Sequence, residues 1–213
     1  IVRTRPGGEM ELPGKRRSLC RVCVYGGSSA AVPADFLRVA AELGEALASQ
    51  GVCLVYGGGG TGMMGAVANA ALGRGGEVVG VITHKLKDLE LAHTGCTALH
   101  IVDTMHERKM LMSELSDAFI ALPGGWGTLE EITEVITWTQ LCIHMKPVGL
   151  LNHSGYWDHL LRWAEHSSNE GFLSDAHRKM VCSEAQPEAL IEALRTVEIP
   201  SIIEKLKKSR AAL

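Results

Sequence analysis

The stretch from residue 52 to residue 83, VCLVYGGGGTGMMGAVANAALGRGGEVVGVIT, decides the fold. It opens on an apolar run, Val52–Tyr56, that ends in a cluster of glycines, and it closes on a second apolar run, Glu77–Thr83. The residues between them, Met63–Gly73, form a helical stretch. Two continuously apolar strands with a helix between them are typical of a parallel sheet that helices cover on both faces.

The same alternation continues in both directions along the chain. Further strands are expected at Arg21–Tyr25, Ala98–Val102, Ala118–Leu122, Pro147–Leu151 and, more weakly, Lys179–Cys182. Helices are expected at Pro33–Ser49, Met105–Leu115 and Leu129–His144 and near 155–170 and 187–196, with a long loop over 84–97. The sequence therefore predicts the α/β class, with one Rossmann-like parallel sheet covered by helices on both faces.

The length of 213 residues suits a single domain. We expect a flexible leader over 1–17, one Rossmann-like domain over 18–198 and a basic tail over 199–213. Hydrophobic residues make up 46% of the chain and charged residues 21%, which is the balance of a globular protein.

Charge and cysteine usage exclude several classes of function. The formal net charge of −3 leaves no basic excess for a nucleic acid. No apolar run reaches the roughly 18–20 residues of a membrane span, and the N-terminus has no apolar secretory core. The six cysteines are scattered, as expected of reduced core residues in a cytoplasmic protein. Cys20 and Cys23 have C-x-x-C spacing but no second pair, and the nine histidines form no H-E-x-x-H, so we expect no redox centre and no metal.

Glycine-rich segments follow several of the expected strands, at the edge of the sheet where ligands bind in such folds. In the segment Gly57–Gly65, Gly60 to Gly65 match G-x-G-x-x-G, which lets a backbone approach a ligand. A dinucleotide site would also need an acid at the end of the next strand, and that strand ends in Thr83 and His84. The segment also lacks the lysine of a P-loop. A mononucleotide is favoured, and tight packing of helix on strand is the alternative.

A second glycine-rich segment runs from Pro123 to Glu131. Three glycines and Thr128 open a helix here, so unpaired N–H groups and the positive helix end favour a phosphate. Glu131 would lie about one turn into the helix and project toward the bound molecule. The alternative is a capping box, in which Glu131 only satisfies the N–H groups of its own helix.

Two further segments are candidates for the same cleft. Thr104 and Glu107 form another capping box, which places Arg108 and Lys109 early in a helix. These cations either form a solvated basic face or point into the cleft, where they would meet phosphate or pair with Glu131. Ser28, in the segment 26–29, either lines the cleft or belongs to an ordinary turn.

Taken together, these segments resemble the LONELY GUY family of cytokinin-activating phosphoribohydrolases. The hallmark P-G-G-x-G-T-x-x-E is complete from Pro123 to Glu131, and its companion M-x-x-R-K is complete from Met105 to Lys109. The segments 26–29 and 57–65 look like the first two ligand loops of the family, in the same order, and the likeness covers residues 20–195.

The resemblance implies hydrolysis of N6-substituted adenosine 5′-monophosphates to a free cytokinin base and ribose 5-phosphate. It also implies that no organic cofactor takes part and that the protein is at least a homodimer. Members of the family have often been labelled lysine decarboxylases, but no lysine here stands out as an anchor for pyridoxal phosphate.

Carried over by motif, the resemblance makes Arg108 and Glu131 the catalytic pair. Substrate contacts are implied at Glu90, Lys109, Gly125, Trp126, Gly127, Thr128, Glu130 and Thr137, and we add Ser28, Met105 and Gly124 to the candidate site. Without the resemblance, Glu90 would be interpreted as a solvated acid. Two other functions stay open: a nucleosidase acting broadly on AMP, GMP or IMP, and a binding module that has no activity.

Overall fold

The computed structural model describes residues 16–88 and 92–200. Most of the expected leader (1–15), the expected substrate contact Glu90 and nearly all of the expected tail (201–213) lie outside the described residues.

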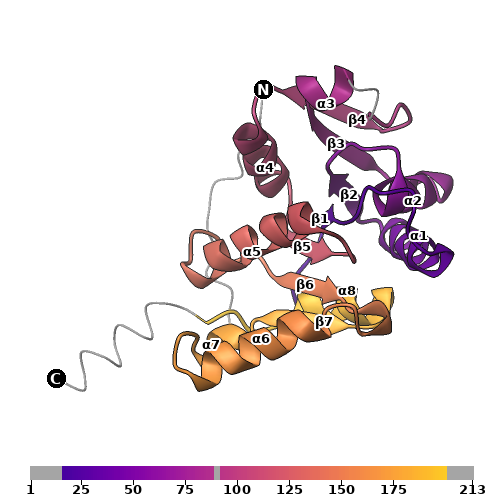
Figure 1. The fold of residues 1–213 in the computed structure, drawn as a ribbon. Helices are drawn as coiled ribbons and strands as arrows, with labels where there is room; N and C mark the ends of the chain where they lie inside the picture. The colour runs from indigo at the N-terminus through magenta and orange to yellow at the C-terminus, as the bar shows by residue number, and fades with distance from the viewer. Residues whose placement is uncertain (1–15, 89–91, 201–213) are drawn as a thin grey trace.

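Seven parallel strands form one sheet, in the order β4-β3-β2-β1-β5-β6-β7 (Figure 1). The strands are β1 (Arg21–Tyr25), β2 (Cys53–Tyr56), β3 (Val78–Thr83), β4 (Ala98–Val102), β5 (Ala118–Ala121), β6 (Val148–Leu151) and β7 (Val181–Glu184). In register, Val24 of β1 lies beside Tyr56 of β2 on one side and Ile120 of β5 on the other. The predicted α/β class with a parallel sheet is confirmed.

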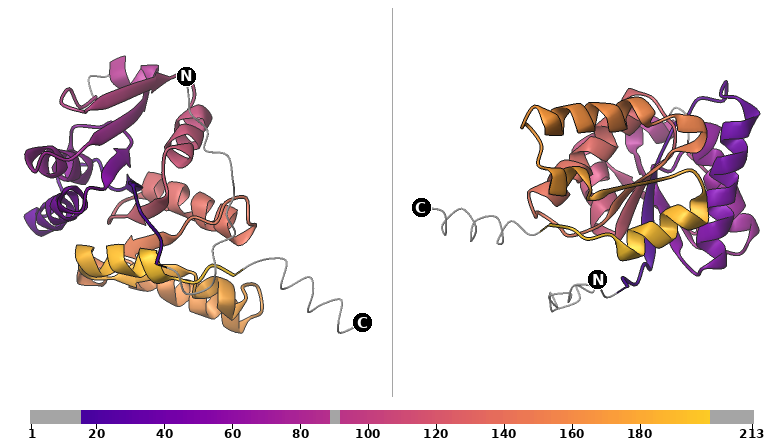
Figure 2. Two further views of the ribbon diagram at one scale, coloured as in Figure 1. Left: turned by 180° about the vertical axis from the view of Figure 1, so that it is seen from behind. Right: turned by 90° about the horizontal axis from the view of Figure 1, so that it is seen from below.

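Helices cover both faces of the sheet, as the views in Figure 2 show. The helices are α1 (Ala34–Ser49), α2 (Gly62–Gly73), α3 (His84–Asp88), α4 (Met105–Glu114), α5 (Trp126–Gln140), α6 (Asp158–Asn169), α7 (Asp175–Arg178) and α8 (Pro187–Thr196), with a 3-10 turn, η1, at His153–Gly155. One hydrophobic core lies between the sheet and α1, α2 and α8, and the second lies between the sheet and α4, α5 and α6.

The two cores explain why the central strands are apolar without alternation. In β1, Val22 and Val24 belong to the core under α1 and α2, whereas Cys23 and Tyr25 belong to the core under α4 and α5. Because successive side chains of a strand point to opposite faces, both sets must be apolar to be buried.

The structure differs from the sequence predictions in several places. α5 begins at Trp126, three residues before the predicted Leu129, because its first turn holds Gly127 and Thr128, which an apolar repeat does not detect. The five-residue α3 lies in the expected loop over 84–97, and it has no buried residue that a pattern could reveal. β7 begins two residues later than predicted, and the four-residue α7 was not expected. Arg16 and Arg17, assigned to the leader, contact α8: Arg16 pairs with Glu192, and the Arg17 amide donates to the Arg195 carbonyl.

All six cysteines are free. Cys23, Cys53 and Cys182 are buried, as expected of core residues, and burial raises the pKa of each thiol. Cys20 is exposed just before β1, so it is not a core residue.

Candidate functional site

The candidate site lies where the order of the strands reverses. From β1 the chain proceeds through β2 and β3 to β4 at one edge, and it then returns to place β5 on the other side of β1. In open parallel sheets, ligands bind at such a switch point, outside the carboxyl ends of the strands. The segments that follow β1 and β5 meet there, and the Gly27 amide donates to the Pro123 carbonyl at 3.0 Å.

The glycine-rich segment after β2 packs onto the segment after β1. The Thr61 hydroxyl donates to the Ser28 carbonyl at 2.9 Å, and the Met63 amide donates to the Gly27 carbonyl at 3.0 Å. Gly62 has a positive φ of 59°, and a Cβ there would lie 2.6 Å from the carbonyl carbon of Ser28, so only glycine fits. The three predicted loops therefore form one surface, on which the Ser28 side chain is exposed.

Arg108, on α4, reaches into this region from the other side. Its Nε donates to the Val81 carbonyl at 2.9 Å, its Nη2 to the Gly57 carbonyl at 3.2 Å, and its Nη1 to Glu131 Oε1 at 3.2 Å. A Cβ on Gly57 would lie 1.9 Å from Nη2, so glycine is required for the guanidinium to lie there. The side chain is only 11% exposed, so of the two alternatives that the sequence leaves open for Arg108, the structure excludes a solvated basic face and shows the pairing with Glu131.

Glu131 lies in the second turn of α5, on the side that faces α4. Its carboxylate is 14% exposed and accepts from Arg108. The N-cap of α5 is Gly125, and no side chain caps this helix, so the capping-box alternative for Thr128 and Glu131 is wrong. Burial raises the pKa of the Glu131 carboxyl, and the adjacent Arg108 guanidinium lowers it only in part. The expected capping box of α4 is present, with Thr104 and Glu107 in the predicted roles.

Lys109 forms a second link between α4 and α5. Its ammonium donates to Glu130 and, at 3.1 Å, to Glu134. Burial lowers the pKa of Lys109, but the hydrogen bonds to both carboxylates outweigh that effect and raise it. The two sequence-predicted contacts Lys109 and Glu130 thus lie together and bind each other.

The segment Gly124–Thr128 presents open backbone at the beginning of α5. Gly124 must be glycine, because a Cβ would lie 2.1 Å from the Thr128 hydroxyl oxygen. Gly125 and Gly127 differ, since a Cβ on either would meet no described atom within 4 Å apart from adjacent residues and the nearby backbone of the same helix. The first N–H groups of a helix have no partner within the helix, so this open surface suits an anion. Trp126, between them, is 86% exposed.

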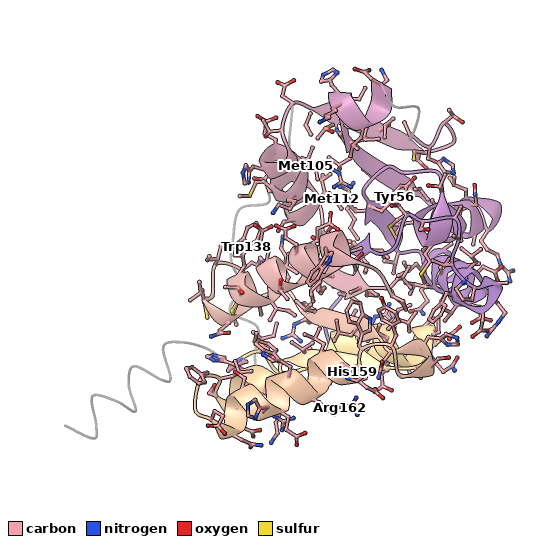
Figure 3. The ribbon with its side chains drawn as sticks, in the orientation of Figure 1. Tyr56, Met105, Met112, Trp138, His159 and Arg162 are labelled. Atoms are coloured by element: carbon pink, nitrogen blue, oxygen red, sulfur yellow. The ribbon has the colours of Figure 1, made fainter. Side chains whose placement is uncertain are left out.

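A cavity of about 470 Å³ adjoins this segment, between the beginnings of α5 and α6. Its lining comprises Gly124, Gly125, Trp126, Leu129, Tyr156, Trp157, His159 and Leu160. In Figure 3 the label of His159, a lining residue, marks α6, while Trp138 marks α5 and Met105 marks α4. No motif in the sequence indicates that Tyr156 and α6 contribute to the site; the one available signal is that the segment after β6 lies at the same edge of the sheet.

Two other predicted residues lie farther from the switch point. Thr137 is exposed, and its hydroxyl donates to the Thr133 carbonyl of its own helix at 2.8 Å, two turns beyond the loop. Met105 opens α4 and is 48% exposed. The structure does not bring these two side chains to Gly124–Thr128, and their contact with substrate stays a prediction.

Two further properties hold for residues 16–88 and 92–200. No three His, Cys, Asp or Glu side chains gather in a way that suits a metal ion. No helix there is both long and apolar enough to cross a membrane.

Comparison with known families and proteins identifies relatives. The family model described as "Possible lysine decarboxylase" matches residues 64–194. A probable cytokinin riboside 5′-monophosphate phosphoribohydrolase of Oryza sativa subsp. japonica is 50% identical over 161 residues, which are 76% of this chain and 65% of that protein. Phosphoribohydrolases of the same description are 44% identical in Arabidopsis thaliana (87% of this chain, 85% of the relative) and 47% identical in Rhodococcoides fascians (82% and 89%). The chain thus spans slightly less than two thirds of the rice protein and more of the other two.

Solved structures support the fold. A molybdenum cofactor binding protein from Rippkaea orientalis superimposes with a TM-score of 0.63 at 24% identity, covering 93% of this chain and 99% of that one. The molybdenum cofactor carrier protein of Chlamydomonas reinhardtii gives 0.62 at 21% identity, over 81% and 94%. At these identities the likeness concerns the Rossmann-like architecture alone.

Proposed function

Because the chain belongs to the LONELY GUY family of cytokinin riboside 5′-monophosphate phosphoribohydrolases, we propose that it hydrolyses the N-glycosidic bond of N6-substituted adenosine 5′-monophosphates. The products are a free cytokinin base and ribose 5-phosphate. The observation that carries this proposal is the Arg108–Glu131 pair, a shielded carboxylate beside a helix N-terminus that suits a phosphate.

The 5′-phosphate binds at the N–H groups of Gly124–Thr128. Glu131 lies five residues after Trp126, or about 7.5 Å along the helix axis at 1.5 Å per residue. A ribose 5-phosphate spans a similar length, so a phosphate at the loop places the anomeric carbon of the sugar near the carboxylate.

The reaction breaks the bond from C1′ to N9 of the base and forms a bond from C1′ to a water oxygen. As the base leaves, positive charge develops on the ribose ring, as in other glycosidic cleavages. The Glu131 carboxylate stabilises this charge or accepts a proton from the attacking water, and the departing base gains a proton at nitrogen. Arg108 is held by the carbonyls of Val81 and Gly57, and its third hydrogen bond, to Glu131, fixes the orientation of the carboxylate.

A product assay tests the activity. The protein is incubated with AMP, GMP, IMP and isopentenyl-AMP, and the free base and ribose 5-phosphate are measured in equal amounts if the bond is hydrolysed. We expect the fastest release from isopentenyl-AMP. Similar rates with all four would indicate a broad nucleosidase, and tight binding of a monophosphate without any ribose 5-phosphate would indicate a binding module.

We also propose that the protein is a homodimer. Part of the apolar surface of α5 is buried within the subunit, since Ile132 and Val135 pack into the core between α5 and the sheet. On α4, Met110 is 49% exposed beside a cavity of about 540 Å³, and we propose this face as the interface between the two subunits.

Sedimentation equilibrium at micromolar concentration tests this assembly. We expect a dimer, and we expect Met110→Glu to dissociate it because a charge in an apolar interface costs desolvation. Ile143→Glu, on a separate exposed apolar position, is the matched control and should remain dimeric. A monomer for the unmodified protein would refute the proposal.

We propose a cytoplasmic location, supported by six free cysteines that suit a reducing compartment. Fractionation of cells that express the protein should recover it with cytoplasmic markers, and recovery with membranes would contradict the proposal.

A further inference from the structure

The turn that follows β6 is held in one conformation by its own residues. Ser154 and Gly155 both have positive φ angles, of 54° and 70°. The Asn152 side chain closes the turn, because its Oδ1 accepts from the Trp157 amide at 2.7 Å and its Nδ2 donates to Asp158 at 2.8 Å. A left-handed non-glycine residue costs about 1 kcal/mol or more, and it persists only where surrounding contacts hold it.

This turn aims Tyr156 at the candidate phosphate loop. The Tyr156 hydroxyl donates to the Gly124 carbonyl at 2.6 Å. Its ring lies between two aromatic side chains, both in edge-on geometry: the ring centroids are 5.9 Å apart for Phe36 and 5.1 Å apart for Trp157. Trp157 is itself buried, so the position of the tyrosine is anchored in the core.

The hydrogen bond from Tyr156 to the Gly124 carbonyl also sets the direction of the Gly125 N–H. A trans peptide is planar, so the carbonyl of one residue and the N–H of the next point in opposite directions. No peptide bond in the described residues is cis. With the Gly124 carbonyl held by Tyr156, the Gly125 N–H must therefore point away from the tyrosine.

Both residues of this peptide are glycines, which have wide freedom of φ and ψ. Gly125 is also the N-cap of α5, and its own carbonyl accepts from the Leu129 amide at 3.0 Å. Without a partner for the Gly124 carbonyl, the peptide between them can rotate at little cost, and its N–H then loses a fixed direction.

We propose that Tyr156 is a positioning residue for the phosphate: by holding the Gly124 carbonyl, it orients the Gly125 N–H toward the 5′-phosphate of the substrate. This proposal rests on the proposed function for the place of the phosphate, but it concerns anion binding and not bond cleavage.

The test is Tyr156→Phe, which removes the hydroxyl and keeps the ring between Phe36 and Trp157. Titration calorimetry with ribose 5-phosphate should give a dissociation constant raised about ten-fold, the value of one hydrogen bond to an anion. KM for the monophosphate should rise by a similar factor with kcat changed less than about three-fold. Binding of the phosphate-free nucleoside should be unchanged, which a merely structural defect would not spare.

Tyr56→Phe is the matched control, because it also removes a tyrosine hydroxyl, but one whose partner is the Cys96 Sγ at 3.4 Å and not the Gly124 carbonyl; its affinity for ribose 5-phosphate should change less than about three-fold. An unchanged dissociation constant in Tyr156→Phe, or an equal loss for the phosphate-free nucleoside, would overturn the proposal. Failure of the unmodified protein to release ribose 5-phosphate would refute the proposed function instead, and the calorimetric comparison does not depend on turnover.

Discussion

Glu131 combines two properties at one residue: a carboxylate that is largely shielded from solvent and an ion pair with the Arg108 guanidinium. A carboxylate that stabilises a developing cation or activates water contributes about 10²- to 10⁴-fold in rate. We therefore expect Glu131→Gln to lower kcat about 10³-fold while the dissociation constant for AMP changes little. Turnover and calorimetry measure the two effects.

Glu134→Gln is the matched control for this substitution. It lies on the same helix and contacts Lys109 instead of Arg108, so kcat should stay within about three-fold. Normal turnover by Glu131→Gln would remove the carboxylate from the mechanism.

The raised pKa of Glu131 predicts how activity depends on pH. The reaction requires the ionised carboxylate, which is lost as the pH falls through that pKa. Because burial raises the pKa, kcat should begin to fall at a pH above the ordinary glutamate value of about 4.3. The phosphate of the substrate titrates near pH 6, so the residual rate of Glu131→Gln is the reference. If the rate of that variant fell over the same acidic pH range, the loss of activity would be due to protonation of the phosphate and not of Glu131.

At the scale of elements, the contact between α1 and α2 depends on Gly44. A Cβ there would lie 2.2 Å from the Val67 carbonyl oxygen, which is backbone and cannot move aside cheaply. Gly44→Ala should therefore lower the free energy of unfolding by about 1–3 kcal/mol. Gly73→Ala, in a helix position where no described atom lies within 4 Å, should be neutral or stabilising by up to about 1 kcal/mol. Urea denaturation measures both, and equal losses would contradict the assigned contact.

The elements themselves were predictable where burial on both faces makes a strand continuously apolar. β1 and β4 have the predicted limits, and most others differ by one or two residues. The beginning of α5 was placed too late because glycine and threonine in a first turn resemble a loop. That error matters for the site, since a helix that begins at Leu129 has Glu131 in its first turn, as a capping box requires, whereas the observed helix has Glu131 in its second turn.

The site was predictable in position and only partly in contacts. Strand ends of a parallel sheet meet at one edge, so the glycine-rich segments could be brought together from sequence alone. Whether Arg108 faces solvent or Glu131 depends on how α4 crosses the sheet, and local sequence left both alternatives open. The partners of its guanidinium at Gly57 and Val81 are backbone carbonyls, which leave no trace in a side-chain pattern.

At the scale of the whole molecule, α4 connects the edge strand β4 to β5, which lies beside the central strand β1. In this connection, Arg108 lies at the carboxyl ends of β2 and β3. It donates to the carbonyls of Val81 and Gly57 there and to Glu131 of α5, so it links the two halves of the sheet. A residue of the candidate site therefore links the segments on the two sides of the switch point. For this reason, a ligand bound there should stabilise the fold as a whole.

This linkage gives a last prediction. In the Glu131→Gln variant, which should not consume its substrate, AMP at 100 times its dissociation constant should stabilise the native state by about 2.7 kcal/mol. For a chain of this size that corresponds to a rise in Tm of about 5–10 °C. Adenosine at the same concentration should give a much smaller rise, because the N–H groups of Gly124–Thr128 bind the phosphate. Equal shifts with AMP and adenosine in a thermal melt would mean that these N–H groups do not hold the phosphate.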